Sequence, residues 1–221
     1  MGFKRFYNKI LGTPWVYDNV RPFVLGYFNE AYRYVYSVPC FEEKDIIIDV
    51  GCGTGNALDY IETYKEYHGF DVDDRALNSL KSKHRDKLGT KVFTYMKNLS
   101  PSDIQKISPT KVLLIGVLHH LSSEEIHNIF MAFKLAPIVR IVTFDVLYIK
   151  GRFINNILAA RDRGQYVRQR HEYEEEIINT GYRINDSRIL QSGNGLAKYL
   201  LMDIKPWRVI NNFISIIGSS K

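Results

Sequence analysis

Three glycines and two acidic residues have the types and spacing of a nucleotide-binding loop. The loop is Asp49-Val50-Gly51-Cys52-Gly53-Thr54-Gly55, and Asp71 follows about 20 residues after its first glycine. Glycines let a backbone turn tightly and approach a ligand that side chains would exclude. An acidic residue at Asp71 can accept hydrogen bonds from both ribose hydroxyls. Because Asn56 stands where a dinucleotide fingerprint has its third glycine, the loop favours a nucleoside ligand without a pyrophosphate.

Two adjacent histidines, His119 and His120, follow an apolar run at 111–115. If that run is a strand of a parallel sheet, both lie at the carboxyl edge, where α/β folds bind ligands. Either imidazole can take a proton from a hydroxyl or phenol near neutral pH. The alternative is structural, with one histidine capping the next helix and the other packing beside the ligand. The sequence leaves both interpretations open.

A basic stretch from 152 to 170 contains a single acidic residue, Asp162, and five arginines: Arg152, Arg161, Arg163, Arg168 and Arg170. Arg168 and Arg170 are predicted to grip a carboxylate or phosphate of the substrate. The alternative is a solvated helix face paired with glutamates downstream. Tyr17, in an aromatic N-terminal segment, is a further candidate for substrate contact, with core packing as its alternative.

The elements that position these residues alternate between short apolar runs and amphipathic stretches. The pattern predicts a helix over 123–136 and a terminal antiparallel hairpin over 182–191 and 196–204, and it predicts strands at 45–50, 67–72, 91–95, 111–115 and 140–144. Strand, helix and strand in repetition indicate a parallel sheet covered on both faces. The glycine loop is expected to open a helix.

These motifs resemble the class I S-adenosylmethionine-dependent methyltransferases. The resemblance rests on IIIDVGCGTG (46–55), GFDVDDRAL (69–77) and VLLIGVLHHLSSEE (112–125), the last being typical of a bacterial small-molecule branch. It implies S-adenosylmethionine as the cofactor, with Asp71 on the ribose and Val72 on the adenine. The residues expected around the cofactor also include Asp49, Gly51, Cys52, Gly53, Gly55 and Gly116. Where the family often has an acid that contacts the adenine, this chain has Lys97, so the candidates for that contact are the side chain of Asn98 and the backbone.

The implied fold is a doubly wound, Rossmann-like α/β domain with helices on both faces of a seven-stranded sheet whose last strand is antiparallel. We expect one methyltransferase domain over 1–221. Its parts are a helical cap (1–42), a cofactor-binding core (43–150), a helical lid (151–181), the hairpin (182–206) and a C-terminal helix or tail (207–221). No metal site is predicted, and two cysteines indicate a reducing, cytoplasmic location.

The distribution of charge bears on the partner. The net charge of +6 comes from +3 over residues 1–40, −1 over 41–150 and +4 over 151–221. A nucleic-acid module usually has a continuous basic stripe, which this distribution does not provide. A small or lipid-like acceptor is therefore preferred, and the arginines favour an anionic one. The leading hypothesis is O-methylation of such an acceptor. The alternatives are a nucleic-acid methyltransferase and an inactive methyltransferase-like binding protein. Apolar-basic terminal segments allow peripheral membrane contact, although helices docked on the domain would have the same pattern.

Overall fold

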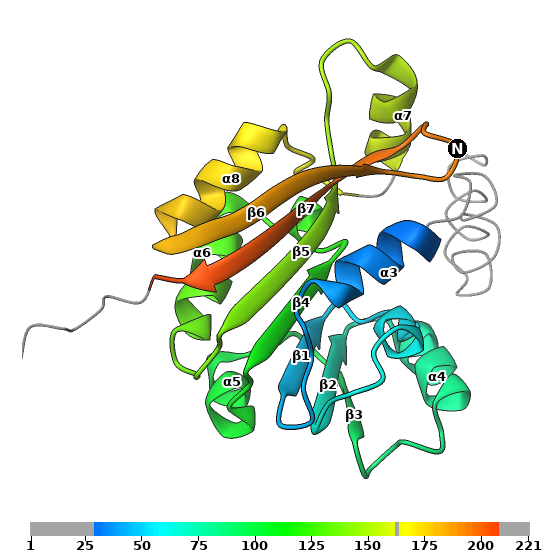
Figure 1. The fold of residues 1–221 in the computed structure, drawn as a ribbon, viewed down its shortest axis with the longest axis vertical. Coiled ribbons are helices and arrows are strands. Elements are labelled where there is room, and N and C mark those ends of the chain that lie inside the picture. Colours follow the sequence, from blue (N-terminus) through cyan, green and yellow to red (C-terminus); the bar gives the residue numbers. More distant parts are fainter. Residues whose placement is uncertain (1–28, 162–163, 208–221) are drawn as a thin grey trace, which may run out of the picture.

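The protein has a seven-stranded sheet with strand order β3-β2-β1-β4-β5-β7-β6 (Figure 1). The structure is a computed structural model that describes residues 29–161 and 164–207. The strands are β1 (Ile46–Val50), β2 (Glu66–Asp71), β3 (Val92–Met96), β4 (Lys111–Ile115), β5 (Arg140–Val146), β6 (Tyr182–Gln191) and β7 (Lys198–Pro206). The predicted Tyr17 and most of the predicted terminal helices lie outside the described residues.

The first five strands are parallel, and β7 is antiparallel to both β5 and β6. The fold class predicted from the sequence is therefore confirmed, including the antiparallel last strand. Central strands such as β1 are buried on both faces, which explains why Ile46–Val50 is apolar at nearly every position instead of alternating.

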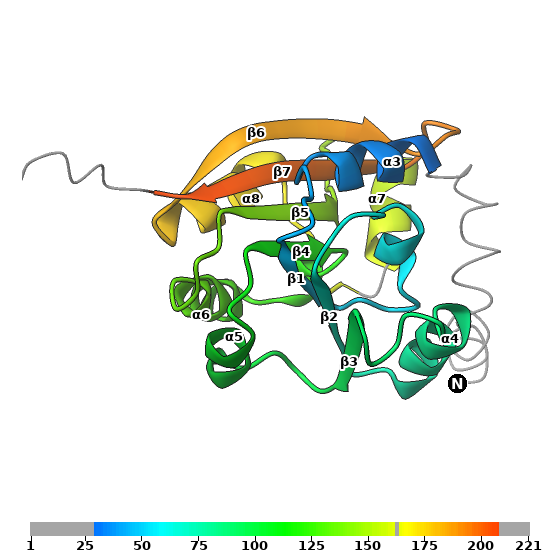
Figure 2. The same ribbon diagram turned by 60° about the horizontal axis from the view of Figure 1, so that its bottom comes forward.

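Helices cover both faces of the sheet (Figure 2). One buried cluster joins the sheet to α3 (Asn29–Ser37), α4 (Asp74–Lys83) and α7 (Phe153–Arg161). The other joins it to α5 (Pro101–Ile107), α6 (Ser123–Phe133) and α8 (Arg170–Asn179). Neighbouring residues of β1 belong to different clusters, Ile47 to the first and Ile48 to the second, because successive side chains of a strand point to opposite faces.

The helix α6 shows how local sequence sets these elements. Ser122 and Glu125 form a reciprocal capping box at its start, and the buried face includes Ile126, Phe130 and Phe133 at helical spacing. The predicted helix over 123–136 is thus present, with its end at Phe133. It packs beside α8, whose own capping box joins Gln169 and Glu172.

The helix expected after the glycine loop is reduced to a single 3-10 turn, η2 (Asn56–Asp59). The sequence expectation was wrong here for two physical reasons. Gly55 offers no side chain to cap a helix, and its backbone packs against α4 so closely that a Cβ would stand 2.7 Å from Cγ of Leu80.

Candidate functional site

The glycine loop turns at the carboxyl end of β1 and is held by the end of β2. The backbone N–H groups of Gly51 and Cys52 both donate to the carbonyl of Phe70, at 2.8 and 3.1 Å. Gly51 and Gly55 have φ of 66° and 80°, in the left-handed region that favours glycine. The loop therefore forms the tight turn that the spacing predicts, without a long helix behind it.

Asp71 lies beside this loop and fixes its shape. Its Oδ2 accepts the backbone N–H of Gly53 at 2.8 Å, and its Oδ1 accepts the N–H of Asp73 at 2.8 Å. An ionised carboxylate has about four lone-pair positions, so each oxygen can accept one more donor. The predicted ribose acceptor is thus also a support of the loop, and its carboxylate is oriented before any ligand binds.

Asp49 is buried under the same loop. The phenol of Tyr67 donates to its Oδ2 at 2.5 Å. Burial raises the pKa of the Asp49 carboxyl to about 7; the hydrogen bond from Tyr67 opposes this shift, and the charge of Asp71 adds to it. At neutral pH the protonated and the ionised form of Asp49 are therefore both populated.

Cys52 packs inward from the loop against β2. Gly69 has no room for a side chain, because a Cβ there would stand 2.8 Å from the Sγ of Cys52. Burial raises the pKa of the Cys52 thiol, which keeps it neutral and a poor nucleophile. Its place in the loop is therefore one of packing and backbone shape.

Apolar side chains are exposed at the carboxyl ends of β2 and β3. Val72 and Met96 are 67% and 61% exposed, which is unusual for such residues next to a buried sheet. Lys97 donates to Asp103 Oδ1 at 2.7 Å, and Asp103 is the acid of the α5 capping box. Lys97 therefore ties this loop to α5, while the adjacent Asn98 is exposed.

The two histidines occupy different environments after β4. Gly116 donates its N–H to the Phe144 carbonyl at 2.8 Å, and a 3-10 turn, η3 (Leu118–His120), follows. His119 is 2% exposed, whereas His120 is exposed. Their ring centroids are 4.1 Å apart.

Asp145, near the end of β5, fixes His119. Its Oδ1 lies 2.8 Å from Nδ1 of His119 and accepts the His119 backbone N–H at 3.2 Å. Because a carboxylate only accepts, the proton belongs on Nδ1. Sequence reasoning missed Asp145. The available signal was an acid near the end of the mostly apolar strand Arg140–Val146, and such an acid must have a partner when buried.

The segment between α7 and α8 lies directly on His119. A Cβ on Gly164 would stand 2.2 Å from Cδ2 of the imidazole, so only glycine fits there. The backbone N–H of Tyr166 donates to the His119 carbonyl at 3.0 Å. The predicted lid region thus contacts the loop that carries both histidines.

Arg168 has a different place from the substrate contact predicted for it. Its side chain is buried, and its guanidinium donates to the carbonyls of Leu118, Tyr166 and Leu121 at 3.2, 3.0 and 3.0 Å. Its Nε also lies 3.5 Å from Glu176. These donors are used to join the 164–168 segment to the loop after β4, which is a structural use of the fork geometry of arginine.

Arg170 is half-exposed at the start of α8. It pairs with Glu174 one turn along the helix, at 2.7 Å, and donates to the Ser187 carbonyl in β6 at 3.2 Å. This arrangement matches the alternative of an arginine paired with a downstream glutamate, and it places Arg170 between α8 and the hairpin.

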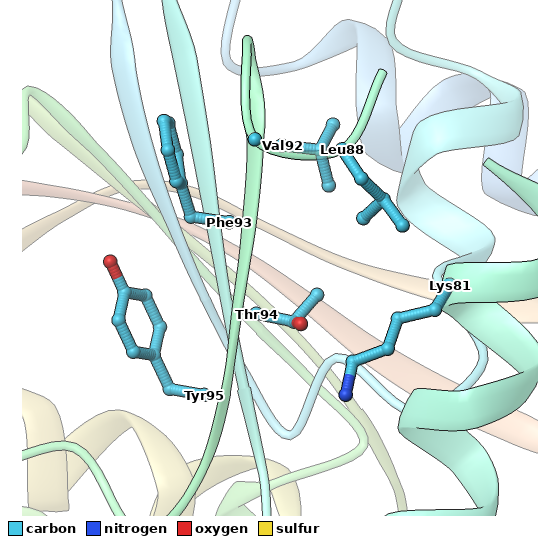
Figure 3. Close-up of a pocket in the computed structure, with 7 residues that line it drawn as sticks. Lys81, Leu88, Val92, Phe93, Thr94 and Tyr95 are labelled. Atoms are coloured by element: carbon cyan, nitrogen blue, oxygen red, sulfur yellow. The ribbon is translucent and has the colours of Figure 1, made fainter. Parts of the chain in front are cut away.

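A surface pocket of about 280 Å³ lies elsewhere, along the edge strand β3 (Figure 3). Phe93 and Tyr95 lie on one side of β3, and Leu88 and Lys81 on the other. None of the predicted site residues lines it. Within residues 29–161 and 164–207 there is no cluster of His, Cys, Asp or Glu suited to a metal ion, and no helix long and apolar enough to cross a membrane.

Comparison with known proteins agrees with this geometry. Residues 48–136, which contain the glycine loop, Asp71 and both histidines, match the family model of a methyltransferase domain. No curated protein matches the sequence. This part of the chain is therefore identified by the family model and not by a close relative.

Solved structures share the fold at low sequence identity. A magnesium protoporphyrin IX methyltransferase from Synechocystis, with bound S-adenosylhomocysteine, has a TM-score of 0.59 and 13% identity over 80% of this chain and 81% of its own. A geranyl diphosphate C-methyltransferase from Streptomyces coelicolor has a TM-score of 0.62 and 11% identity, over 80% of this chain and 78% of its own. A 1,6-didemethyltoxoflavin-N1-methyltransferase from Burkholderia thailandensis has a TM-score of 0.61 and 12% identity, over 80% of this chain and 76% of its own.

Proposed function

We propose that this chain, an S-adenosylmethionine-dependent methyltransferase, transfers the methyl group to an oxygen of a small acceptor. The main support for the cofactor site is the position of the Asp71 carboxylate. The backbone N–H groups of Gly53 and Asp73 orient it, and each of its oxygens can still accept a hydrogen bond from a ribose hydroxyl. Around it, Asp49, Gly51, Cys52, Gly53 and Gly55 would surround the methionine part, with Gly116 across the site. Val72 and Met96 offer an apolar surface for adenine, and Asn98 an amide for its edge.

Methyl transfer from a sulfonium is an in-line displacement. The cofactor supplies an activated methyl group, and the protein holds the acceptor oxygen, the carbon and the sulfur in line and keeps water out. A base is needed only when the acceptor arrives protonated. His120 is the residue we assign to that proton, because it is exposed beside the site while His119 is covered by the 164–168 segment.

His119 then serves as the support of His120. Asp145 fixes its ring, and the two imidazole centroids are 4.1 Å apart, so a displaced His119 would also displace His120. Replacing His120 with Gln should reduce kcat and remove the acid limb of the pH profile, with little change in melting temperature. Replacing His119 with Gln should lower both kcat and the melting temperature. The opposite pattern would exchange the two roles.

The acceptor is proposed to be a small molecule. The names of the structurally similar enzymes give magnesium protoporphyrin IX, geranyl diphosphate and 1,6-didemethyltoxoflavin, which are all small molecules. Free cysteines at Cys40 and Cys52 suit the reducing cytoplasm that we expect as its location. With Arg168 engaged in the fold, anionic character of the acceptor depends on Arg170 and other exposed basic groups.

The test has two stages. S-adenosylhomocysteine or S-adenosylmethionine should raise the melting temperature, and Asp71→Ala should abolish that shift. Labelled cofactor should then transfer its methyl group to a component of a metabolite extract, and not to RNA or DNA. Cofactor binding without any transfer would instead support the inactive binding protein.

A further inference from the structure

A run of five residues that leads into α7 is fully displayed on the surface. Residues 150–154, Lys-Gly-Arg-Phe-Ile, are all exposed. Phe153 is 77% exposed and Ile154 is 57% exposed, and Tyr148 shortly before them is 42% exposed. A single exposed apolar residue is ordinary, but adjacent large ones at the start of a helix form a contiguous apolar patch that marks a contact surface.

Two asparagines in the first turn of α7 fasten this surface to the sheet. The buried Asn155 donates to the Leu147 carbonyl at 2.7 Å and accepts the N–H of Lys198, at the start of β7, at 2.7 Å. Asn156 accepts the N–H of Ile149 at 2.9 Å and donates to its carbonyl at 2.8 Å. Since these amides occupy the inner side of the turn, the fold itself holds Phe153 and Ile154 toward solvent.

Charge indicates what this surface meets. Lys150 and Arg152 are exposed beside the apolar pair, and the sequence has no Asp or Glu between Val146 and Arg161. Basic side chains next to exposed aromatic and aliphatic ones are the chemistry of an anionic lipid surface, in which the apolar groups enter the interface and the cations pair with headgroups. A nucleic acid would use the cations, and a single strand would stack a base on Phe153, but neither contact covers the aliphatic Ile154.

We propose that residues 148–154, with Phe153 and Ile154 as the inserting pair, dock the protein on a membrane of anionic lipids. The surface follows β5, so docking would bring the carboxyl edge of the sheet, where Asp145 and His119 lie, close to the bilayer. The proposal concerns binding to lipid and does not depend on which atom is methylated.

Cosedimentation of the full chain with phosphatidylcholine vesicles, with and without phosphatidylglycerol, tests this docking. The wild type should pellet with the anionic vesicles at low salt. The double variant Phe153→Ser/Ile154→Ser should bind the vesicles at least about tenfold more weakly than the wild type, because it loses two inserting side chains. Lys150→Gln/Arg152→Gln should remove the preference for anionic vesicles. Ile178→Ser, on an equally exposed residue of α8, should bind like the wild type.

Three outcomes would overturn the proposal: no sedimentation of the wild type, equal sedimentation of the Phe153→Ser/Ile154→Ser variant, or a wild-type dimer in the ultracentrifuge that this variant converts to a monomer. The last result would assign the surface to a second copy of the chain. A melting-temperature shift with S-adenosylhomocysteine, measured for every variant, separates loss of docking from loss of fold or of the cofactor site.

Discussion

Gly164 lies so close to His119 that no other residue fits, since a Cβ would stand 2.2 Å from Cδ2 of the ring and 2.7 Å from the His119 carbonyl oxygen. The contact couples the segment before α8 to the loop after β4. Any side chain at 164 must displace either the segment or the imidazole that Asp145 holds.

Gly164→Ala should therefore reduce methyl transfer more than cofactor binding. Overpacking at such a contact costs about 1 to 3 kcal/mol of folding stability. We expect a lower melting temperature and a loss of kcat of at least about tenfold, measured beside an unchanged Kd for S-adenosylhomocysteine. Gln165→Ala, at the exposed neighbouring residue, is the matched control and should leave both values as they are.

Arg168→Ala should destabilise the fold far more than Arg170→Ala. Loss of the Arg168 side chain leaves three carbonyl acceptors without their donor, at a cost of about 3 kcal/mol of folding stability. The half-exposed ion pair between Arg170 and Glu174 contributes less than about 1 kcal/mol. Urea unfolding measures the difference. If both variants kept wild-type stability and only KM for the acceptor rose, Arg168 would be a substrate contact after all.

Asp145→Ala should cost about 2 to 3 kcal/mol, because it removes both hydrogen bonds that fix His119. Asp145→Asn keeps an acceptor and the volume of the side chain, so it should restore most of the stability. Its kcat should stay lower than that of the wild type, since a neutral amide does not stabilise a cationic imidazole pair. Full recovery of kcat in the Asn variant would leave Asp145 with a packing role alone.

Cofactor affinity should depend on pH through Asp49. S-adenosylmethionine is cationic, and a cation favours the ionised carboxylate. Because the pKa of Asp49 is about 7 without ligand, binding should release a proton and weaken by up to about tenfold per pH unit below 7. Calorimetry in two buffers with different ionisation enthalpies measures that release.

Asn at position 49 is the control for this linkage. Asp49→Asn mimics the protonated carboxyl and still accepts the Tyr67 hydroxyl, so it should bind weakly with no pH dependence in this range. In the unliganded wild type the raised pKa has a further effect on folding. The contribution of Asp49 to stability is full below about pH 4 and is lost as pH rises through 7. A pH-dependent affinity that survived in Asp49→Asn would assign the titration to another group.

The sheet was predictable because its strands are buried runs with a strong period, as in Ile46–Val50 and Lys111–Ile115. The glycine loop and Asp71 were predictable from spacing along the chain. The short η2 turn was not, since it depends on how closely Gly55 approaches Leu80. The role of Arg168 was also hidden, because nothing in the sequence tells whether a guanidinium faces a ligand or the carbonyls of its own chain.

The order of the strands has a consequence for how the chain is made. Among the strands of residues 29–161 and 164–207, β7 is the last to leave the ribosome, and it lies between β5 and β6 instead of at an edge of the sheet. Until Pro206 has emerged, β5 has an unpaired edge, and β6 has no strand partner within residues 29–161 and 164–207. A product that stops before Lys198 would therefore retain the cofactor loop but expose these unpaired strands to aggregation.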